Sequence, residues 1–395
     1  MKYFSFVLII GVLLITISCT RHDSNYDDDD NDDSGDDDSA DDDEYLPEID
    51  EDWSYDIIDK RAADNNLSLD LVNNVYIYYY DPSRTDGKNA LFYTTNLNNW
   101  AIQKYPIDVK LSTDFSSSAL SSAIGPNDEL HLLYAAESKS LPTYELFYAI
   151  YENGSWLTAC ISDTIARNPS PSLAIDEGGN VHISYYEGAE EDNDLIYVNN
   201  TSGMWQYEIV ESGAGKETYQ HSIIKVSNGI VYFVYIGLAT EAKKNKVIVA
   251  KKTEMGLEKT IITEDVGSLS MDVDETGSMH IACYNFSTPR TISYISDCSG
   301  EWVTSIVADD FAGSSLSLAI DANQKGHIVH SGINNSETKV GAMYVNNISG
   351  DWYSEEIFAD DADIISMAID GDNKIHVAMN AGSYLVHLTR EIPQE

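Results

Sequence analysis

Residues 170–187 read S-P-S-L-A-I-D-E-G-G-N-V-H-I-S-Y-Y-E and decide the fold. Leu173 and Ile175 alternate with other residues, Asp-x-x-Gly supplies a turn, and V-H-I-S-Y-Y is rich in β-branched and aromatic residues. This pattern predicts two strands joined by a tight turn. The segments L-I-Y-V (195–198) and M-W-Q-Y-E-I-V (204–210) predict two more strands, so the unit has four.

The same pattern recurs along the chain. The other copies lie at 67–80, 120–134, 221–235, 268–284, 315–330 and 365–379. One position of the second strand anchors the alignment and is occupied by Tyr76, His131, His182, Tyr232, His280, His327 and His376. A period near fifty residues with four short strands is typical of a propeller blade and not of a helical solenoid.

The tryptophans indicate how the ring closes. All six occupy one position, in the fourth strand of the unit: Trp53, Trp100, Trp156, Trp205, Trp302 and Trp352. The last unit ends at Glu395 before its own tryptophan position, whereas Trp53 precedes the first complete unit. We therefore predict an all-β fold, a seven-bladed β-propeller of four-stranded antiparallel blades at 53–395. The N-terminal strand 53–58 joins the last blade and removes the open edge of the array.

The units resemble the repeat S-L-A-x-D-x-x-G-x-x-H-I-x-Y-Y of secreted bacterial β-propeller proteins, which are akin to the sialidase/Asp-box superfamily. The resemblance covers about residues 53–390 and implies the propeller fold. It is weaker for activity, because D-C-S-G-E-W (297–302) places Trp two residues after Gly where an Asp box has three.

The N-terminus predicts export. Residues 4–17 form an apolar run that is too short to cross ~30 Å of hydrocarbon, and a small residue and Cys19 follow it. I-T-I-S-C resembles the bacterial lipobox, which implies a lipoprotein-type signal peptide at 1–18 and a lipidated Cys19; an ordinary signal peptide is the alternative. Thr20 favours the outer membrane by analogy. We expect a lipid-anchored protein of the bacterial cell envelope, at the outer membrane or cell surface.

The charge is strongly acidic. Against 23 basic residues stand 66 acidic ones, a net charge of −43. Residues 20–52 hold 18 acidic residues and one basic one, which predicts that 19–52 is the lipidated cysteine followed by a disordered acidic linker. Residues 53–395 still have 48 acidic and 21 basic residues. This charge excludes nucleic acid as a partner and leaves the lipid anchor as the membrane contact.

The repeated polar residues predict structural roles. One His per blade places the imidazoles around the ring, whereas zinc ligands must converge within ~2.1 Å of one ion. We therefore predict no metal site and no cofactor, and interpret the histidines as hydrogen-bonding groups between blades. Asp176 and its equivalents read as turn caps, with weak Ca²⁺ binding there or in the linker as the alternative. Cys160, Cys283 and Cys298 are expected to be free, mostly buried thiols.

Three tyrosines carry the binding hypothesis, and Arg84, Arg167 and Arg290 are the other predicted ligand-binding residues. Tyr80, Tyr186 and Tyr284 lie four residues after the anchor, at the loop-facing end of the second strand. Aromatic rings there suit stacking on sugars, although the same rings could instead seal the blades together. We predict a monomeric, non-catalytic ligand-binding or scaffold protein whose ligand is a glycan or an envelope protein; a protein-docking platform of an envelope complex is an alternative.

The enzymatic alternative is a glycoside hydrolase or lyase of sialidase-like type. Arg84, Arg167 and Arg290 fall in loops of one face, and sialidases hold a substrate carboxylate with three arginines, whose guanidinium forks match it. The resemblance implies further candidates, with Tyr186 or Tyr219 as nucleophile, Glu187 assisting it and Asp194 as acid. Seven units argue against this reading, because sialidase catalytic domains have six blades.

Overall fold

The computed structural model describes residues 49–393, apart from short segments at 61, 63, 81–90, 105–119, 138–143, 166–169, 189–192, 215–219, 239–244, 287, 310, 334–339 and 359–360. The predicted signal peptide, Cys19 and all but the end of the acidic linker lie outside the described residues. Among the residues described, no helix is long and apolar enough to cross a membrane.

The strands follow one another in groups of four. Blade 1 contains β2 (Asp64–Leu69), β3 (Val75–Tyr80), β4 (Leu91–Thr95) and β5 (Gln103–Lys104). Blade 2 contains β6 (Leu120–Ile124), β7 (Leu130–Glu137), β8 (Tyr144–Glu152) and β9 (Ser155–Ile165). Blade 3 contains β10 (Ser172–Ile175), β11 (Val181–Glu187), β12 (Asp194–Asn199) and β13 (Gln206–Glu211). Blade 4 contains β14 (Ser222–Ser227), β15 (Ile230–Leu238), β16 (Asn245–Thr253) and β17 (Gly256–Glu264).

The remaining blades have the same order. Blade 5 contains β18 (Val266–Val273), β19 (Met279–Asn285), β20 (Thr291–Ser296) and β21 (Val303–Ala308). Blade 6 contains β22 (Phe311–Ile320), β23 (Gly326–Ile333), β24 (Val340–Asn346) and β25 (Tyr353–Phe358). Blade 7 contains β26 (Ala362–Ile369), β27 (Lys374–Ala381), β28 (Tyr384–Glu391) and, as its outer strand, β1 (Ser54–Lys60). The short helix η1 (Asn96–Asn98) follows β4.

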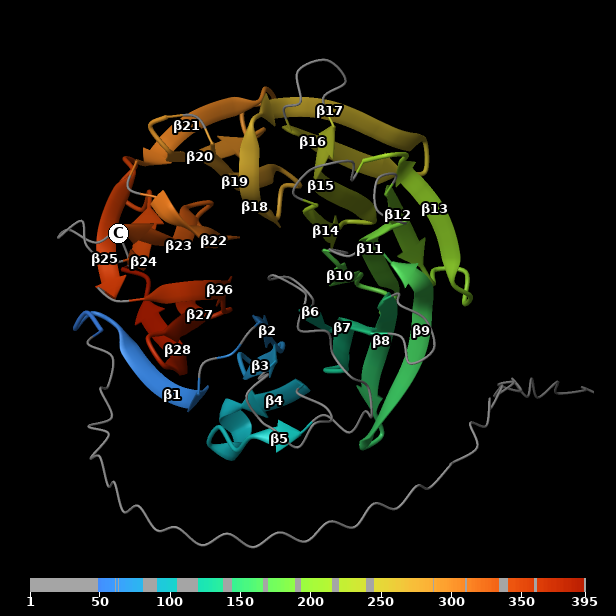
Figure 1. Cartoon of the computed structure of the whole chain (residues 1–395), viewed down its shortest axis with the longest axis horizontal. Helices are drawn as coiled ribbons and strands as arrows, with labels where there is room; N and C mark the ends of the chain where they lie inside the picture. The colour runs from blue at the N-terminus through green and yellow to red at the C-terminus, as the bar shows by residue number, and fades with distance from the viewer. Residues whose placement is uncertain are drawn as a thin grey trace, which may run out of the picture. The chain divides into compact units, whose positions relative to one another are not determined.

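The seven-bladed propeller is confirmed, and so is its closure. β1 pairs antiparallel with β28, and Tyr55 lies opposite Leu388. Figure 1 shows β1 beside the last blade, although β2 follows it in the chain and begins the first blade. The closing strand begins one residue after Trp53 and ends at Lys60, so it is slightly longer than the predicted 53–58.

Five of the six tryptophans pack against an aromatic ring on the third strand of the preceding blade, with centroids 4.8–6.0 Å apart. The pairs are Tyr93 with Trp156, Tyr148 with Trp205, Tyr294 with Trp352, Tyr344 with Trp53, and His387 with Trp100. Large apolar rings in these positions give each interface much of its buried area.

Serines near the axis tie neighbouring inner strands together. A backbone N–H of one inner strand donates to a side-chain oxygen of the preceding one at 2.9–3.1 Å. The pairs are Leu67 with Ser366, Ser122 with Asn66, Leu173 with Ser121, Ile224 with Ser172, Leu318 with Ser270, and Met367 with Ser317. These bonds satisfy inner-strand donors that no sheet partner reaches.

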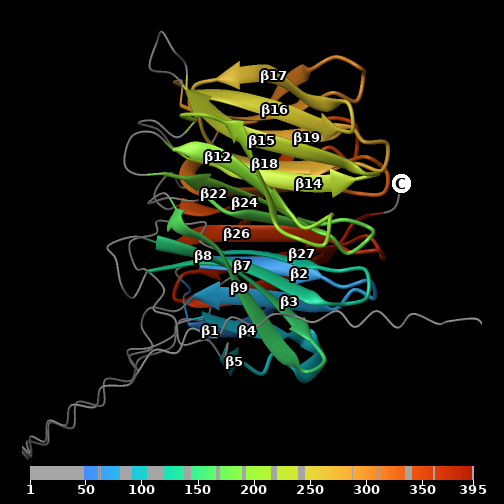
Figure 2. The ribbon, with the colours of Figure 1, turned by 90° about the vertical axis from the view of Figure 1, so that its right-hand side faces the viewer.

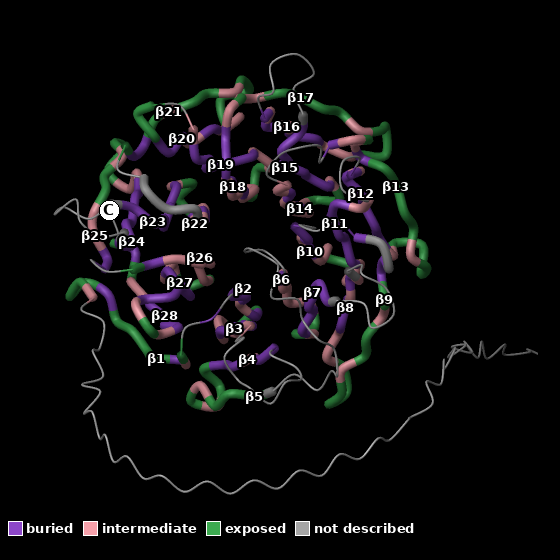
Figure 3. The backbone as a smooth tube through the Cα atoms, viewed as in Figure 1, coloured by how far each residue is buried: buried purple, intermediate pink, exposed green. Residues whose placement is uncertain are grey.

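Burial follows the radial position of a strand. Figure 3 shows buried residues along the middle strands and exposed ones along outer strands such as β13 and β17. Seen from the side, the strands run between two faces of the ring (Figure 2). We define the loop face as the face at which the second strands β3, β11 and β19 end, and the turn face as the opposite one, which carries the Asp-x-x-Gly turns.

Candidate functional site

The repeated aspartate and histidine lie near the turn face and bond within their own blade. In blade 3, Asp176 Oδ1 accepts hydrogen bonds from the backbone N–H groups of Gly178 and Asn180 at 2.9 and 2.7 Å. Its Oδ2 lies 3.4 Å from His182 Nε2, and His182 Nδ1 lies 2.7 Å from the hydroxyl of Tyr197. The turn-cap prediction for Asp176 is confirmed. The prediction that the histidines bond between blades is wrong, because each bonds to a residue on the third strand of its own blade, such as Tyr197.

The unit recurs around the ring with substitutions. Asp274, His280 and Tyr294 form it in blade 5, and Asp321, His327 and Tyr344 form it in blade 6. In blade 7, His387 replaces the tyrosine and lies 3.1 Å from His376, which lies 3.0 Å from Asp370. A polar chain that is buried and internally bonded stabilises one arrangement of the turn and the two middle strands.

Burial favours the neutral form of four of these histidines. It lowers the pKa of His131 to about 4 and that of His387 to about 3. The pKa values of His182 and His376 are also lowered, again chiefly by burial, although their aspartates oppose the shift. Burial opposes ionisation of Asp176, but hydrogen bonds from Asn180 and His182 hold its pKa below the ordinary value. The chain of bonds is therefore carboxylate, neutral imidazole and phenol.

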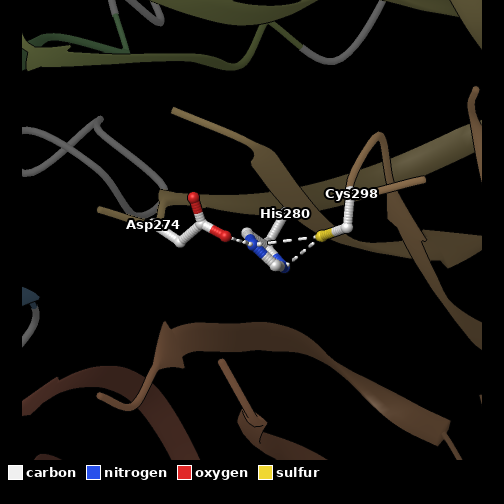
Figure 4. A group of neighbouring side chains, drawn as sticks. All are labelled: Asp274, His280 and Cys298. Carbon is white, nitrogen blue, oxygen red and sulfur yellow. Dashed lines mark hydrogen bonds and ion pairs between the residues drawn. The ribbon is translucent and has the colours of Figure 1, made fainter. Parts of the chain in front are cut away.

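Blade 5 adds a thiol to this unit. Cys298, in the turn between β20 and β21, lies beside His280, its Sγ 3.6 Å from Nε2 and 3.9 Å from Nδ1. On the other side of the imidazole, Asp274 Oδ2 lies 3.2 Å from Nε2. Figure 4 shows the carboxylate and the thiol approaching the imidazole from two directions. The repeat pattern does not predict this group; its signal in the sequence is a cysteine where the turns of blades 3 and 6 have Thr201 and Ile348.

The three cysteines are free, as predicted. Their predicted burial is wrong for two of them, because Cys160 and Cys298 are exposed and Cys283 alone is buried. Cys160 lies on an outer strand and Cys298 in a turn, both of which face solvent. Burial raises the pKa of Cys283 to about 12, which makes that thiol unreactive at neutral pH.

The predicted ligand-binding tyrosines differ in exposure. Tyr186 is completely buried, and its hydroxyl donates to the backbone oxygens of His221 and Ile236 at 3.2 and 3.0 Å. Tyr284 is 6% exposed and meets Phe286 edge-on, with centroids 5.2 Å apart. Gly267 permits this packing, since a Cβ there would lie 2.9 Å from the Phe286 ring. Tyr80, at the end of β3, is partly exposed and packs against the core cluster that contains Leu91 and Leu132.

The predicted sialidase-like residues are only partly placed. Arg84, Arg167 and Tyr219 lie outside the described residues, and Arg290 is exposed just before β20. Glu187 accepts a hydrogen bond from the Ser162 hydroxyl at 2.7 Å, and Asp194 accepts one from the Gly213 N–H at 2.8 Å. Burial raises the pKa of Tyr186, and its hydroxyl is already occupied, so this phenol is held as a structural group.

A hollow lies where β1 pairs with β28 and closes blade 7. It is lined by Asp52, Ser54, Lys374, Thr389, Arg390, Glu391 and Pro393. Arg390 bonds to Glu355, lies 3.5 Å from Asp52, and sits over the rings of Trp53 and Tyr344. Its guanidinium therefore already contacts residues of blades 6 and 7, and we interpret the hollow as a structural feature of the ring closure.

Comparison with known proteins shows the fold. No protein-family model and no curated protein matches the chain. The polysaccharide lyase Uly1 is similar in structure, with a TM-score of 0.53 at 12% identity over 82% of this chain and 88% of that one. A PL25 ulvan lyase bound to -[GlcA(1-4)Rha3S]- has a TM-score of 0.54 at 11% identity, over 85% of this chain and 97% of that one. A mutant of AofleA from Arthrobotrys oligospora has a TM-score of 0.51 at 10% identity, over 78% of this chain and 90% of that one.

These likenesses establish a β-propeller resembling polysaccharide lyases in architecture. Identities of 10–12% carry neither substrate nor catalytic residues to this chain. The sialidase-type repeat resemblance stays a prediction, since no family model matches.

Proposed function

We propose that this protein is a non-catalytic, carbohydrate-binding β-propeller that receives its ligand at the loop face. The observation that carries the proposal is the set of side chains at that face. Tyr80 ends the second strand of blade 1, and Phe286 follows the second strand of blade 5; both residues are partly exposed. Glu187 and the exposed Arg290 lie at the same face on blades 3 and 5. Aromatic planes among hydrogen-bonding groups match the alternating apolar faces and hydroxyl edges of sugars.

The charge of the propeller indicates a neutral glycan. Residues 53–395 have 48 acidic against 21 basic residues, and this negative net charge repels a polyanion at low ionic strength. A neutral glycan has no such cost. The similar lyases support a saccharide as the class of ligand, because one of them was solved with a bound saccharide.

A glycan array probed with the full chain tests this proposal. We expect retention of neutral glycans, and weaker binding by the variants Tyr80→Ala and Arg290→Ala. Tyr353→Ala is the matched control, because Tyr353 is 59% exposed but lies on the outer strand β25. A broad panel with no retained sugar would refute glycan binding, and capture of a single envelope protein instead would favour the docking platform.

A polysaccharide lyase is the second candidate. The likeness to Uly1 and to the PL25 ulvan lyase favours it, since each covers more than four fifths of this chain. Under this reading Arg84, Arg167 and Arg290 would bind an acidic sugar; Tyr186 and Glu187 are the candidates for a sialidase-like mechanism. The buried phenol of Tyr186 speaks for the non-catalytic reading. Incubation with uronate-containing polysaccharides separates the two, because β-elimination leaves a conjugated double bond that absorbs ultraviolet light.

The proposal places this propeller on the bacterial cell envelope. Its support is the lipobox-like I-T-I-S-C before Thr20 and the acidic stretch that follows. Expression with a radiolabelled fatty acid tests the anchor. Label should enter the chain and be absent from Cys19→Ser; equal labelling of both would refute lipidation at this residue.

A further inference from the structure

Blade 5 has a cysteine in the turn between its third and fourth strands. The turns read N-T-S-G in blade 3, D-C-S-G in blade 5 and N-I-S-G in blade 6. Thr201 donates its hydroxyl hydrogen to Asn199 Oδ1 at 2.6 Å, and Ile348 has no donor or acceptor in its side chain. Cys298 therefore adds a metal-binding atom to a histidine that the other blades use only for structure.

The three donor atoms are spaced like ligands of one ion. In a tetrahedral zinc site, bond lengths of ~2.0–2.3 Å separate neighbouring ligand atoms by roughly 3.3–3.6 Å. Asp274 Oδ2 lies 3.2 Å from His280 Nε2, and Cys298 Sγ lies 3.6 Å from the same nitrogen. Among the residues that the structure describes, Asp274, His280 and Cys298 form a group of three His, Cys or carboxylate ligand atoms that all lie within 4.8 Å of one another.

The supporting groups hold two of the ligands in place. Asp274 Oδ1 accepts hydrogen bonds from the N–H groups of Thr276 and Ser278 at 2.9 Å, which leaves Oδ2 toward the imidazole. The Tyr294 hydroxyl bonds to Nδ1 of His280, which directs Nε2 to the carboxylate side. Partners of this kind orient metal ligands and fix the histidine tautomer.

The thiol of Cys298 connects the two buried ligands to solvent. His280 is completely buried and Asp274 is 7% exposed, whereas Cys298 is exposed. Its Sγ lies almost equally far from the two ring nitrogens, so it packs against the imidazole and not in line with Nε2. In the proposed site, Sγ would have to move toward Nε2 and Oδ2 by rotation about the Cα–Cβ bond between staggered rotamers. An ion would enter from the solvent side and keep one position for water.

We propose that Asp274, His280 and Cys298 bind one thiophilic divalent cation of the Zn²⁺ class, with a fourth position open to solvent. A thiolate, an imidazole and a carboxylate together suit zinc, and the sulfur disfavours Ca²⁺ and Mg²⁺. This site is independent of the glycan-binding proposal, because it lies near the turn face and the proposed sugar site lies at the loop face.

Titration of the full chain with Co²⁺, a spectroscopic probe for zinc sites, tests the proposal. The chain carries Cys19→Ser, so that Cys160, Cys283 and Cys298 are its cysteines. We expect one equivalent of Co²⁺ to give a sulfur-to-cobalt charge-transfer band that Zn²⁺ then abolishes. In Cys298→Thr, which installs the residue of blade 3, the band should vanish and the affinity for Zn²⁺ should fall at least tenfold.

The controls separate the site from its alternatives. Cys160→Ser removes the other exposed thiol and should leave the band unchanged. The acidic segment 20–52 is present in every variant, so weak binding to its carboxylates cancels in the comparison. Thermal unfolding should show that Zn²⁺ raises the Tm of the parent chain and not that of Cys298→Thr. A chain without the charge-transfer band, or one whose band survives in Cys298→Thr, would overturn the proposal.

Discussion

The indole ring of Trp53 meets the phenol ring of Tyr344 edge-on, with centroids 5.4 Å apart and planes at 85°. These residues are separated by almost the whole propeller in sequence, yet they occupy the same repeat positions as Trp352 and Tyr294, which meet between blades 5 and 6. The first strand of the propeller therefore forms its last blade–blade interface in the way that consecutive blades form theirs.

Replacing Trp53 should weaken the whole ring. Trp53 is 5% exposed and packs with Val377 and Leu388 of blade 7, so Trp53→Ala removes a large buried side chain. We expect a loss of about 3–5 kcal/mol in the free energy of unfolding, measured by chemical denaturation. Tyr353→Ala, at an exposed position, should change it by less than about 0.5 kcal/mol. Equal stability of both variants would mean that β1 does not hold the ring closed.

The serine positions near the axis predict a second stability effect. Ser270 Oγ accepts from Leu318 N–H at 3.0 Å, and Ser317 Oγ accepts from Met367 N–H at 3.1 Å. Ser270→Ala or Ser317→Ala leaves a buried N–H without its acceptor and should cost about 1–3 kcal/mol. Ser299→Ala is the control, because Ser299 bonds in an exposed turn. Hydrogen exchange at the two amides offers a direct readout, and unchanged protection there would contradict the role of the hydroxyls.

The buried histidines predict loss of stability on acidification. Their folded pKa values lie below the ordinary 6.5, at about 4 for His131 and about 3 for His387. The unfolded chain therefore binds more protons as the pH falls below about 6.5, and each such histidine lowers stability by about 1.4 kcal/mol per pH unit until its folded pKa is reached. Stability should be full above pH 7 and should decline toward pH 4.

His387→Tyr tests the contribution of one imidazole to this decline. Tyrosine occupies the equivalent position in blades 2, 3, 5 and 6, where it bonds to the same ring nitrogen of the anchor histidine. The variant should therefore fold and should show a shallower fall of Tm between pH 6 and pH 4. A slope identical to that of the parent chain would show that His387 does not titrate on unfolding.

Blade 2 caps its turn with a different carboxylate. Gly125 stands where blade 3 has Asp176, and Glu129 stands where it has Asn180. Glu129 Oε2 accepts from Asn127 N–H at 3.0 Å, the same turn position that Asp176 caps at Gly178. A Cβ at Gly125 would lie 2.6 Å from that Oε2 atom, so the two carboxylates compete for one place.

A double-mutant cycle tests this exchange. Gly125→Asp alone should destabilise the chain, because it crowds a second carboxylate against Glu129. Gly125→Asp with Glu129→Asn, which reproduces the blade 3 turn, should recover most of the loss, with a coupling of about 1–3 kcal/mol. Additive effects in thermal unfolding would show that the two positions act independently.

The sequence predicts the interior of each blade well because that information is local. Alternating apolar residues define the strands, and Asp176 caps its turn through atoms only two to four residues away. The environment of a repeat position is less predictable. Tyr80 and Tyr186 are equivalent in sequence, but Tyr186 is completely buried against blade 4, while Tyr80 is partly exposed. The difference comes from the neighbouring blade and not from the repeat.

The sequence by itself determined the number of blades, their four strands and the closure through Trp53, because a repeat of fixed period can bury its apolar faces only by stacking copies, and one tryptophan was displaced to the start. The tertiary structure alone decided which groups meet across strands and blades. It paired each anchor histidine with a tyrosine or a second histidine on the adjacent strand, used serines to tie the inner strands together, and brought Cys298 to His280. Contacts of this kind depend on strand register and side-chain direction, which a one-dimensional pattern does not carry.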